Sequence, residues 1–146
     1  MSAASLSPQA LAEACAKALW DDDNATRHLG MELVSVAPGE ATITMTIADS
    51  MTNGHGTCHG GYMFTLADSA FAFACNTYNQ RTVAQHGSVT FIAPAFRGDR
   101  LTATAREVSR RGRGGIYDIG ITNQEGEVIA EFRGHSRTVK GTYLPE

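Results

Sequence analysis

The chain has 146 residues, enough for one domain, and its hydrophobic fraction of 42% and charged fraction of 18% are ordinary for a globular protein. A formal net charge of −3 argues against a general nucleic-acid-binding protein, which would usually be basic. The three cysteines, Cys15, Cys58 and Cys75, have no C-x-x-C spacing, which fits a reducing compartment better than a disulfide framework.

The first residues, MSAASLSPQALAEAC, lack a basic stretch followed by an apolar one, so we expect no signal peptide. Nowhere does an apolar run reach about 18 residues, so we expect no membrane span. The sequence therefore predicts a cytoplasmic protein that binds neither nucleic acid nor membrane.

A helix is predicted first, because Ser7 followed by Pro8 is typical of an N-cap and a first helical residue. Apolar residues then recur at helical spacing until about Asp22. Asn24 is expected to cap a short further turn that stops at Gly30. Two strands follow, on either side of a turn at Pro38-Gly39. In the second strand, Ala41, Ile43, Met45 and Ile47 alternate with threonines, the period of a half-buried strand.

Residues 49–60 are expected to form a loop, and residues 61 to about 78 a helix that is apolar nearly all round. A helix of that kind is predicted to be buried on every side. Four more strands are expected, with turns at residues 97–99 and 124–126 between members of the set. These strands cover residues 83–93, 99–110, 115–123 and 127–139.

Consecutive strands without helices between them predict a mainly antiparallel sheet, hence an α+β fold. One long sheet and one central helix form a compact unit if the sheet curls around the helix, which is the hotdog fold. We expect residues 1–28 to be an extra N-terminal helical segment and residues 29–146 to be the hotdog domain, with six strands. Because exposed strand edges and an open face need covering, we expect at least a dimer.

The segment NGHGTCHGGYMFTLAD, residues 53–68, resembles the motif of hotdog-fold acyl-CoA thioesterases, in particular the PaaI type associated with phenylacetate degradation. The resemblance runs from about Leu29 through Thr138 and includes GSVTFIAPAFRGD, residues 87–99. It implies hydrolysis of phenylacetyl-CoA or hydroxyphenylacetyl-CoA and a homotetramer made of two hotdog dimers. It implies no metal and no cofactor, since coenzyme A is part of the substrate. The active-site residues that it implies are Asn53, His59, Gly60 and Asp68.

The chemistry of these residues suits thioester hydrolysis, which needs an activated water and donors aimed at the developing oxyanion. Gly60 stands where a helix begins, so its backbone N–H is a candidate oxyanion donor, helped by that of Gly61. Asp68 would act as general base or as nucleophile, and the sequence does not choose between these roles. Asn53 would orient the water or Asp68, unless Asn53-Gly54 is only a turn. His59 would either donate to the substrate or hold the loop.

Other polar residues are candidates for substrate contact. Thr65 and Ser69 flank Asp68 and could touch substrate, although for Ser69 a role in capping backbone is favoured. The run SRRGRGG is either a solvated turn or a site for the phosphates of coenzyme A, and we favour phosphate binding. The residues concerned are Arg110, Arg111, Gly112 and Arg113.

Gly60 and Asp68 are eight residues apart, which on a helix means about 12 Å along the axis. One helix cannot present both groups to one thioester, so we expect each active site to be shared across a two-fold axis. The alternatives are a hotdog protein that binds acyl-CoA without hydrolysing it, a thioesterase with Cys58 as nucleophile, and a dehydratase. Zinc at His55 and His59 is disfavoured because the pair lies in a Gly-rich loop rather than on a helix.

Overall fold

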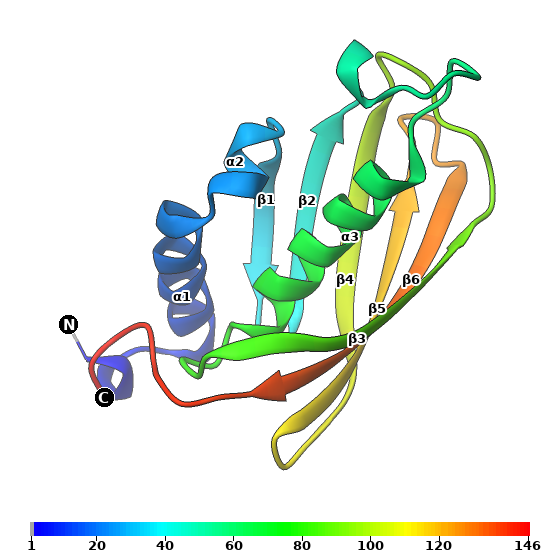
Figure 1. The fold of residues 1–146 in the computed structure, drawn as a ribbon. Helices are drawn as coiled ribbons and strands as arrows, with labels where there is room; N and C mark the ends of the chain where they lie inside the picture. Colours follow the sequence, from blue (N-terminus) through cyan, green and yellow to red (C-terminus); the bar gives the residue numbers. More distant parts are fainter. Residues whose placement is uncertain (1) are drawn as a thin grey trace.

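A computed structural model describes residues 2–146. In this range the α-helices are α1 (Pro8–Asp22), α2 (Asn24–His28) and α3 (Gly60–Cys75). The strands are β1 (Glu32–Ala37), β2 (Glu40–Thr46), β3 (Thr82–Phe91), β4 (Arg100–Arg111), β5 (Gly114–Thr122) and β6 (Val128–Thr138). They form one sheet in the order β1-β2-β4-β5-β6-β3 (Figure 1), in which every neighbouring pair is antiparallel.

The sheet curls around α3, which lies along one face and contacts all six strands (Figure 1). This arrangement confirms the expected α+β class and hotdog fold. The core lies between α3 and the inward residues of the strands. In β2, Ala41, Ile43 and Met45 are buried as their alternation predicts. The free edges of the sheet belong to β1 and β3.

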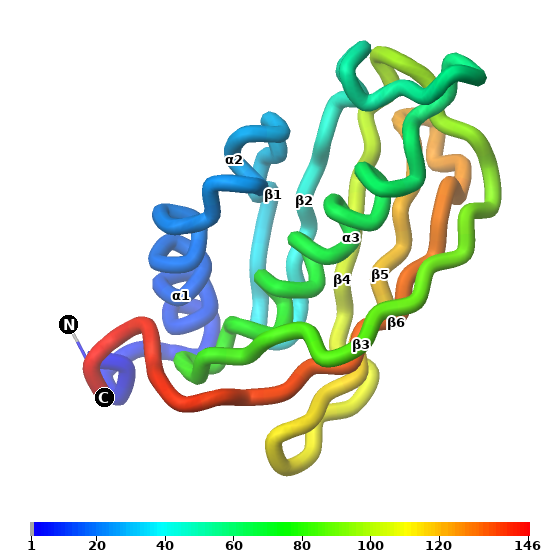
Figure 2. The backbone as a smooth tube through the Cα atoms, viewed as in Figure 1, coloured from blue at the N-terminus to red at the C-terminus, as the bar shows by residue number. Residues whose placement is uncertain are grey.

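The N-terminal helices pack beside β1, at the edge of the sheet opposite β3 (Figure 2). Ser7 caps α1 as expected, because its side chain accepts the Ala10 N–H at 3.1 Å. The expected cap of α2 is wrong by one residue. Asp23 is the N-cap, since its carboxylate accepts the Thr26 N–H at 3.0 Å, and Asn24 is the first helical residue.

Helix α3 ends at Cys75, three residues earlier than expected. Polar side chains follow the helix: the Asn76 side-chain amide donates to Ala72 O on α3 and to Thr82 O on β3, and the Thr77 hydroxyl donates to Ala74 O. The bonds to Ala72 O and Ala74 O satisfy carbonyl groups at the end of the helix.

The expectation that α3 is buried on every side is also wrong for the single chain. Nine of its 16 residues are buried, but one face remains partly open to solvent. We call this face the open stripe; it consists of Gly61, Phe64, Thr65, Asp68 and Ala72. Large apolar side chains are also exposed at the end of β3 and just after it, namely Phe91, Ile92 and Phe96.

The division of the chain at residue 28 into an N-terminal segment and a thioesterase domain stays a prediction, and Met1, which belongs to that segment, lies outside the described residues. Across residues 2–146, no helix combines the length and apolar character needed to cross a membrane.

Candidate active site

The loop before α3 is held by Asn53. Its side-chain oxygen accepts from the N–H of His55 at 2.9 Å, and from the N–H and hydroxyl of Thr57 at 3.3 and 3.2 Å. The Asn53 oxygen is therefore committed to the loop. Only its amide NH₂ is left to donate to a water or a carboxylate.

His59 is the N-cap of α3. Its Nδ1 accepts the Gly61 N–H at 3.0 Å, so this nitrogen carries a lone pair and the proton of the neutral ring is assigned to Nε2. The imidazole is exposed and can still donate through Nε2. In this arrangement the Gly61 N–H is already hydrogen-bonded, and its help to Gly60 as an oxyanion donor stays a prediction.

Gly60 keeps a free backbone donor. Its N–H, at the first turn of α3, has no acceptor among residues 2–146. A Cβ at this position would lie 2.7 Å from Cζ of Phe91, so a side chain larger than hydrogen would displace that ring. Gly60 and Phe91 line a cavity of about 360 Å³, whose other apolar walls include Cys58, Met63, Ile92 and Pro94.

Asp68 lies on the open stripe, halfway along α3, and is half-buried. No hydrogen bond to its carboxylate is formed by any of the described residues. Burial raises the pKa of Asp68, and the negative charge of Asp23 raises it further. An unpaired carboxylate of this kind can accept a proton, as a general base, or attack a carbon atom, as a nucleophile.

The hydroxyls beside Asp68 are both engaged. The Thr65 hydroxyl donates to Gly61 O, one turn back, at 2.9 Å. Ser69 is buried, and its Oγ lies 2.8 Å from Oγ1 of Thr26 on α2. The favoured role of Ser69 in capping backbone is therefore wrong, because its partner is a side chain 43 positions away. Contact of Thr65 and Ser69 with substrate stays a prediction.

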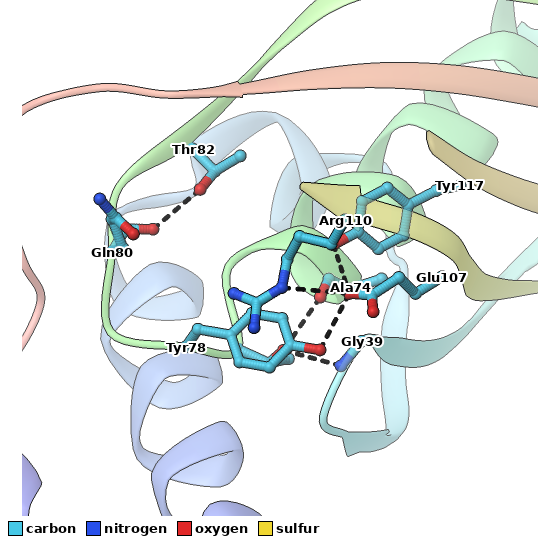
Figure 3. Close-up of polar contacts among 9 residues, drawn as sticks. Gly39, Ala74, Tyr78, Gln80, Thr82, Glu107, Arg110 and Tyr117 are labelled. Atoms are coloured by element: carbon cyan, nitrogen blue, oxygen red, sulfur yellow. Dashed lines mark hydrogen bonds and ion pairs between the residues drawn. The ribbon is translucent and has the colours of Figure 1, made fainter. Parts of the chain in front are cut away.

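The arginines of the β4–β5 hairpin differ from one another. The Arg110 guanidinium lies 3.4 Å from the ring centroid of Tyr78 and 3.8 Å from the Glu107 carboxylate (Figure 3). Glu107 also accepts from the hydroxyls of Tyr78 and Tyr117, each at 2.9 Å. Burial raises the pKa of Tyr117 above its ordinary value, with the Glu107 bond adding to it, so this phenol stays protonated.

Arg110 is thus part of a structural cluster that the sequence did not reveal, because its members lie up to 39 positions apart. Arg111, Gly112 and Arg113 form the exposed tip of the hairpin, where Gly112 has φ 61°. Figure 1 places this hairpin at the end of the sheet away from the first turn of α3. Gly60, Asp68 and the hairpin therefore do not meet within one chain.

Within residues 2–146, no three His, Cys, Asp or Glu side chains gather in a way that could hold a metal ion. The expectations of no metal and no cofactor stay predictions.

The fold is a curled antiparallel sheet around one helix, and that helix carries an unpaired carboxylate and a free glycine N–H. Residues 55–130 match the family model described as the thioesterase superfamily. The chain belongs to this superfamily.

Among individual proteins, the chain is 43% identical over 131 residues to the acyl-coenzyme A thioesterase PaaI of Escherichia coli, covering 90% of this chain and 94% of that one. It is 33% identical over 121 residues to human acyl-coenzyme A thioesterase 13, covering 80% and 86%.

The solved E. coli PaaI structure, from the phenylacetic acid degradation operon, matches with a TM-score of 0.91 and covers 93% of this chain and 99% of that one. A mutant structure of the Thermus thermophilus phenylacetic acid degradation protein PaaI matches with a TM-score of 0.77 at 33% identity, covering 80% and 100%. The resemblance to hotdog-fold thioesterases of the PaaI type is confirmed, and the chain is an enzyme of the thioesterase class.

Proposed function

We propose that this thioesterase hydrolyses phenylacetyl-CoA, or its ring-hydroxylated relatives, to the free acid and coenzyme A. The relatives named acyl-coenzyme A thioesterases support the class of substrate, and the operon named for the E. coli structure supports the acyl group. The observation that carries the proposal is the half-buried, unpaired Asp68 on the open stripe of α3. A half-buried carboxylate without a partner lowers the stability of a fold, and groups of this kind often belong to functional sites.

The reaction needs one hydrogen-bond donor for the thioester oxygen and one carboxylate that acts as base or nucleophile. The Gly60 N–H bonds to the thioester oxygen and stabilises the negative charge that develops there. In the general-base route, Asp68 takes a proton from water while the water oxygen bonds to the carbonyl carbon. The C–S bond then breaks, coenzyme A leaves as a thiolate, and the proton passes to it.

In the nucleophilic route, an oxygen of Asp68 attacks the carbonyl carbon and expels the thiolate, which leaves a mixed anhydride that water hydrolyses. Both routes use the same residues, and both leave Asn53 and His59 to orient the water or the substrate. The thioester carries its own activation, so neither route calls for a cofactor or a metal.

Each active site is shared between two copies of the chain in this proposal. Gly60 and Asp68 are about 12 Å apart along one helix, too far to act on one carbonyl group. Two α3 helices running antiparallel across a two-fold axis would bring Gly60 of one copy to Asp68 of the other. The open stripe and the exposed apolar residues near the end of β3 support a second copy there. The full assembly is then a homotetramer of two such dimers.

The acyl group and the phosphates of coenzyme A bind at different places on the protein. The apolar cavity of about 360 Å³ beside Gly60 suits an aromatic acyl group. The phosphates of coenzyme A would bind Arg111, Arg113 and the N–H of Gly112, which are exposed. Arg110 contributes less, because it is already paired with Glu107 and stacked on Tyr78.

The alternatives are less well supported. Cys58 is buried, and burial raises the pKa of its thiol to about 11, so almost no thiolate is present at neutral pH. A protein that only binds acyl-CoA would gain nothing from an unpaired carboxylate at this position.

The test is thiol release from a panel of acyl-CoA thioesters by the wild type and by Asp68→Asn, which keeps the shape of the side chain. Loss of about a thousandfold in kcat for arylacetyl-CoA in the variant is expected. No release by the wild type with any thioester would favour the binding protein, and wild-type rates in the variant would move the chemistry to another residue.

Sharing of the site has its own experiment. Mixed dimers of Asp68→Asn with Gly60→Val, whose side chain would block the donor, contain one intact Gly60–Asp68 pair. Regained activity on mixing and refolding is expected, and two inactive parents that give inactive mixtures would contradict sharing.

A further inference from the structure

A short series of hydrogen bonds, part-buried at Asp23 and buried at Ser69, links α2 to the turn of α3 that carries Asp68. Thr26 is almost fully buried, and its hydroxyl lies 2.7 Å from Oδ2 of Asp23 and 2.8 Å from Oγ of Ser69. The other oxygen of Asp23, Oδ1, accepts the Thr26 N–H at 3.0 Å. The series Asp23–Thr26–Ser69 ends one residue from Asp68, and its Thr26–Ser69 bond joins positions 43 apart in sequence.

The direction of these bonds follows from their donors. Ionised Asp23 can only accept, so the single hydroxyl proton of Thr26 goes to the carboxylate. Thr26 then has only lone pairs to offer Ser69, and Ser69 must donate to Thr26. Because one end of the series is charged, its bonds are stronger than bonds between two neutral groups, and they fix the rotation of α3 at this turn.

The charges around Asp68 are few. Burial is the larger cause of the raised pKa of Asp68, and the negative charge of Asp23 raises it further. The neighbouring Cys75 is buried and its pKa is raised to about 12, so it is neutral. The basic residues of α2 are exposed in its last turn, where Arg27 bonds to the side-chain oxygen of Asn24. The strand residues buried against α3 are apolar apart from neutral Thr and Ser side chains and the phenol of Tyr117.

We propose that Asp23 is a positioning residue of this active site, which holds the turn of α3 that carries Asp68 through Thr26 and Ser69 and places a negative charge beside the reactive carboxylate. The inference rests on the role of Asp68 in the proposed function. It gives the N-terminal segment, which lies outside the matched range 55–130, a part in the chemistry. A base whose proton affinity is raised works closer to neutral pH.

The charge is tested by titrating the Asp68 carboxyl carbon by NMR in the wild type and in Asp23→Asn. Asparagine also caps helices, so α2 is expected to stay intact, and Asp23→Ser is a second capping variant. The titration midpoint of Asp68 is expected to fall by roughly 0.5 unit in both variants. The acidic limb of the kcat/KM profile for arylacetyl-CoA should move to lower pH by the same amount.

The matched control is Asp22→Asn, which removes an equal charge from the adjacent, exposed residue and should leave the midpoint unchanged. An Asp68 midpoint that stays at the wild-type value in both Asp23 variants would overturn the electrostatic role. The NMR readout needs no turnover, so a wild type that hydrolyses no thioester would refute the proposed hydrolase and still leave this result interpretable.

The series of bonds is tested separately. Thr26→Val removes the linking hydroxyl and keeps the Asp23 charge, so kcat should fall about tenfold while the Asp68 midpoint stays within roughly 0.2 unit of the wild type. Thr26→Ser restores the hydroxyl and should restore kcat. Wild-type kcat in Thr26→Val, or no recovery in Thr26→Ser, would overturn the positioning role.

Discussion

Asp68 lowers the stability of the fold at neutral pH, because its pKa is raised by burial and by Asp23 and its charged form has no partner. A raised carboxyl pKa means that the folded state binds the proton more tightly than the unfolded state does. The stability that this carboxyl contributes is therefore full below its ordinary pKa and is lost as the pH rises through the raised value.

Asp68→Asn is expected to raise the Tm at pH 7 by about 2–4 °C although it lowers kcat, because it removes the half-buried charge and keeps the volume of the side chain. Scanning calorimetry at pH 4 and pH 7 checks this, and the gain should shrink at the lower pH. Asp118→Asn is a control of opposite sign, since Arg133 lowers the pKa of Asp118 and that variant should lose stability at pH 7. An unchanged or lower Tm for Asp68→Asn at pH 7 would contradict the destabilising effect of the Asp68 charge.

His59→Ala is expected to cost about 1 kcal/mol of unfolding free energy, because the N-cap bond to the Gly61 N–H is lost. Urea denaturation measures this, and His59→Asn should recover most of it through its own capping oxygen. Turnover of His59→Asn then separates the two roles left open for this residue: a cap alone predicts wild-type kcat, and a donor to the substrate predicts a loss. Equal stability of His59→Ala and the wild type would contradict the cap.

For individual residues, the sequence predicted the candidate site residues but not their hydrogen-bond partners. The motif placed Gly60 at the start of a helix and Asp68 within it, and both are there. That His59 occupies the Gly61 N–H depends on a ring orientation that spacing does not encode. Ser69 bonds to Thr26, and Glu107 binds two tyrosines, because distant elements pack together; local patterns carry no signal for such contacts.

Helix α3 and β6 approach each other closely at one point. A Cβ on buried Gly134 would lie 2.6 Å from Cε2 of Phe71, whose ring packs against Tyr117 and Phe132. Glycine here allows α3 to lie this close to the sheet. A displaced helix would carry Asp68 with it.

Gly134→Ala is expected to destabilise the protein by about 1–3 kcal/mol through overpacking. Gly120→Ala on β5 is the control, because its Cβ would meet Glu131 Oε2 at an ordinary 3.6 Å. Chemical denaturation of the two variants measures the difference. Similar midpoints would show that the Phe71 ring has room to move.

The positions of the strands and turns were predicted well from the sequence pattern. The alternation in β2 and the turns at Gly98 and Gly126, both with positive φ, lie where they were expected. Helix ends followed less well. Asp23 rather than Asn24 caps α2, and Asn76 and Thr77 end α3 early, because several adjacent polar side chains could each serve as a cap and tertiary packing selects one.

The single chain leaves one face of α3 partly exposed to solvent. The apolar composition of α3 predicted burial on every side, yet one chain leaves the open stripe exposed. We expect a second copy of the chain to cover this stripe, because the apolar composition of α3 suits a helix buried on every side. The covering copy is therefore expected on the side of the sheet that carries β3.

Phe64→Glu places a charge on the open stripe and is expected to weaken self-association at least tenfold. Val34→Glu is the control, because Val34 is 58% exposed on β1, at the other edge of the sheet. Sedimentation velocity over a concentration series measures both. Equal sedimentation of the two variants and the wild type would place the dimer contact elsewhere.

All three thiols of the chain, Cys15, Cys58 and Cys75, are buried, with at most 4% of any of these residues exposed. Burial also raises the pKa of each, so neither access nor ionisation favours attack on a disulfide reagent. Ellman's reagent should therefore leave the native protein unlabelled and colour only with the coenzyme A set free. In the absence of substrate, the rate at which the protein thiols are slowly labelled would then measure how often the protein unfolds.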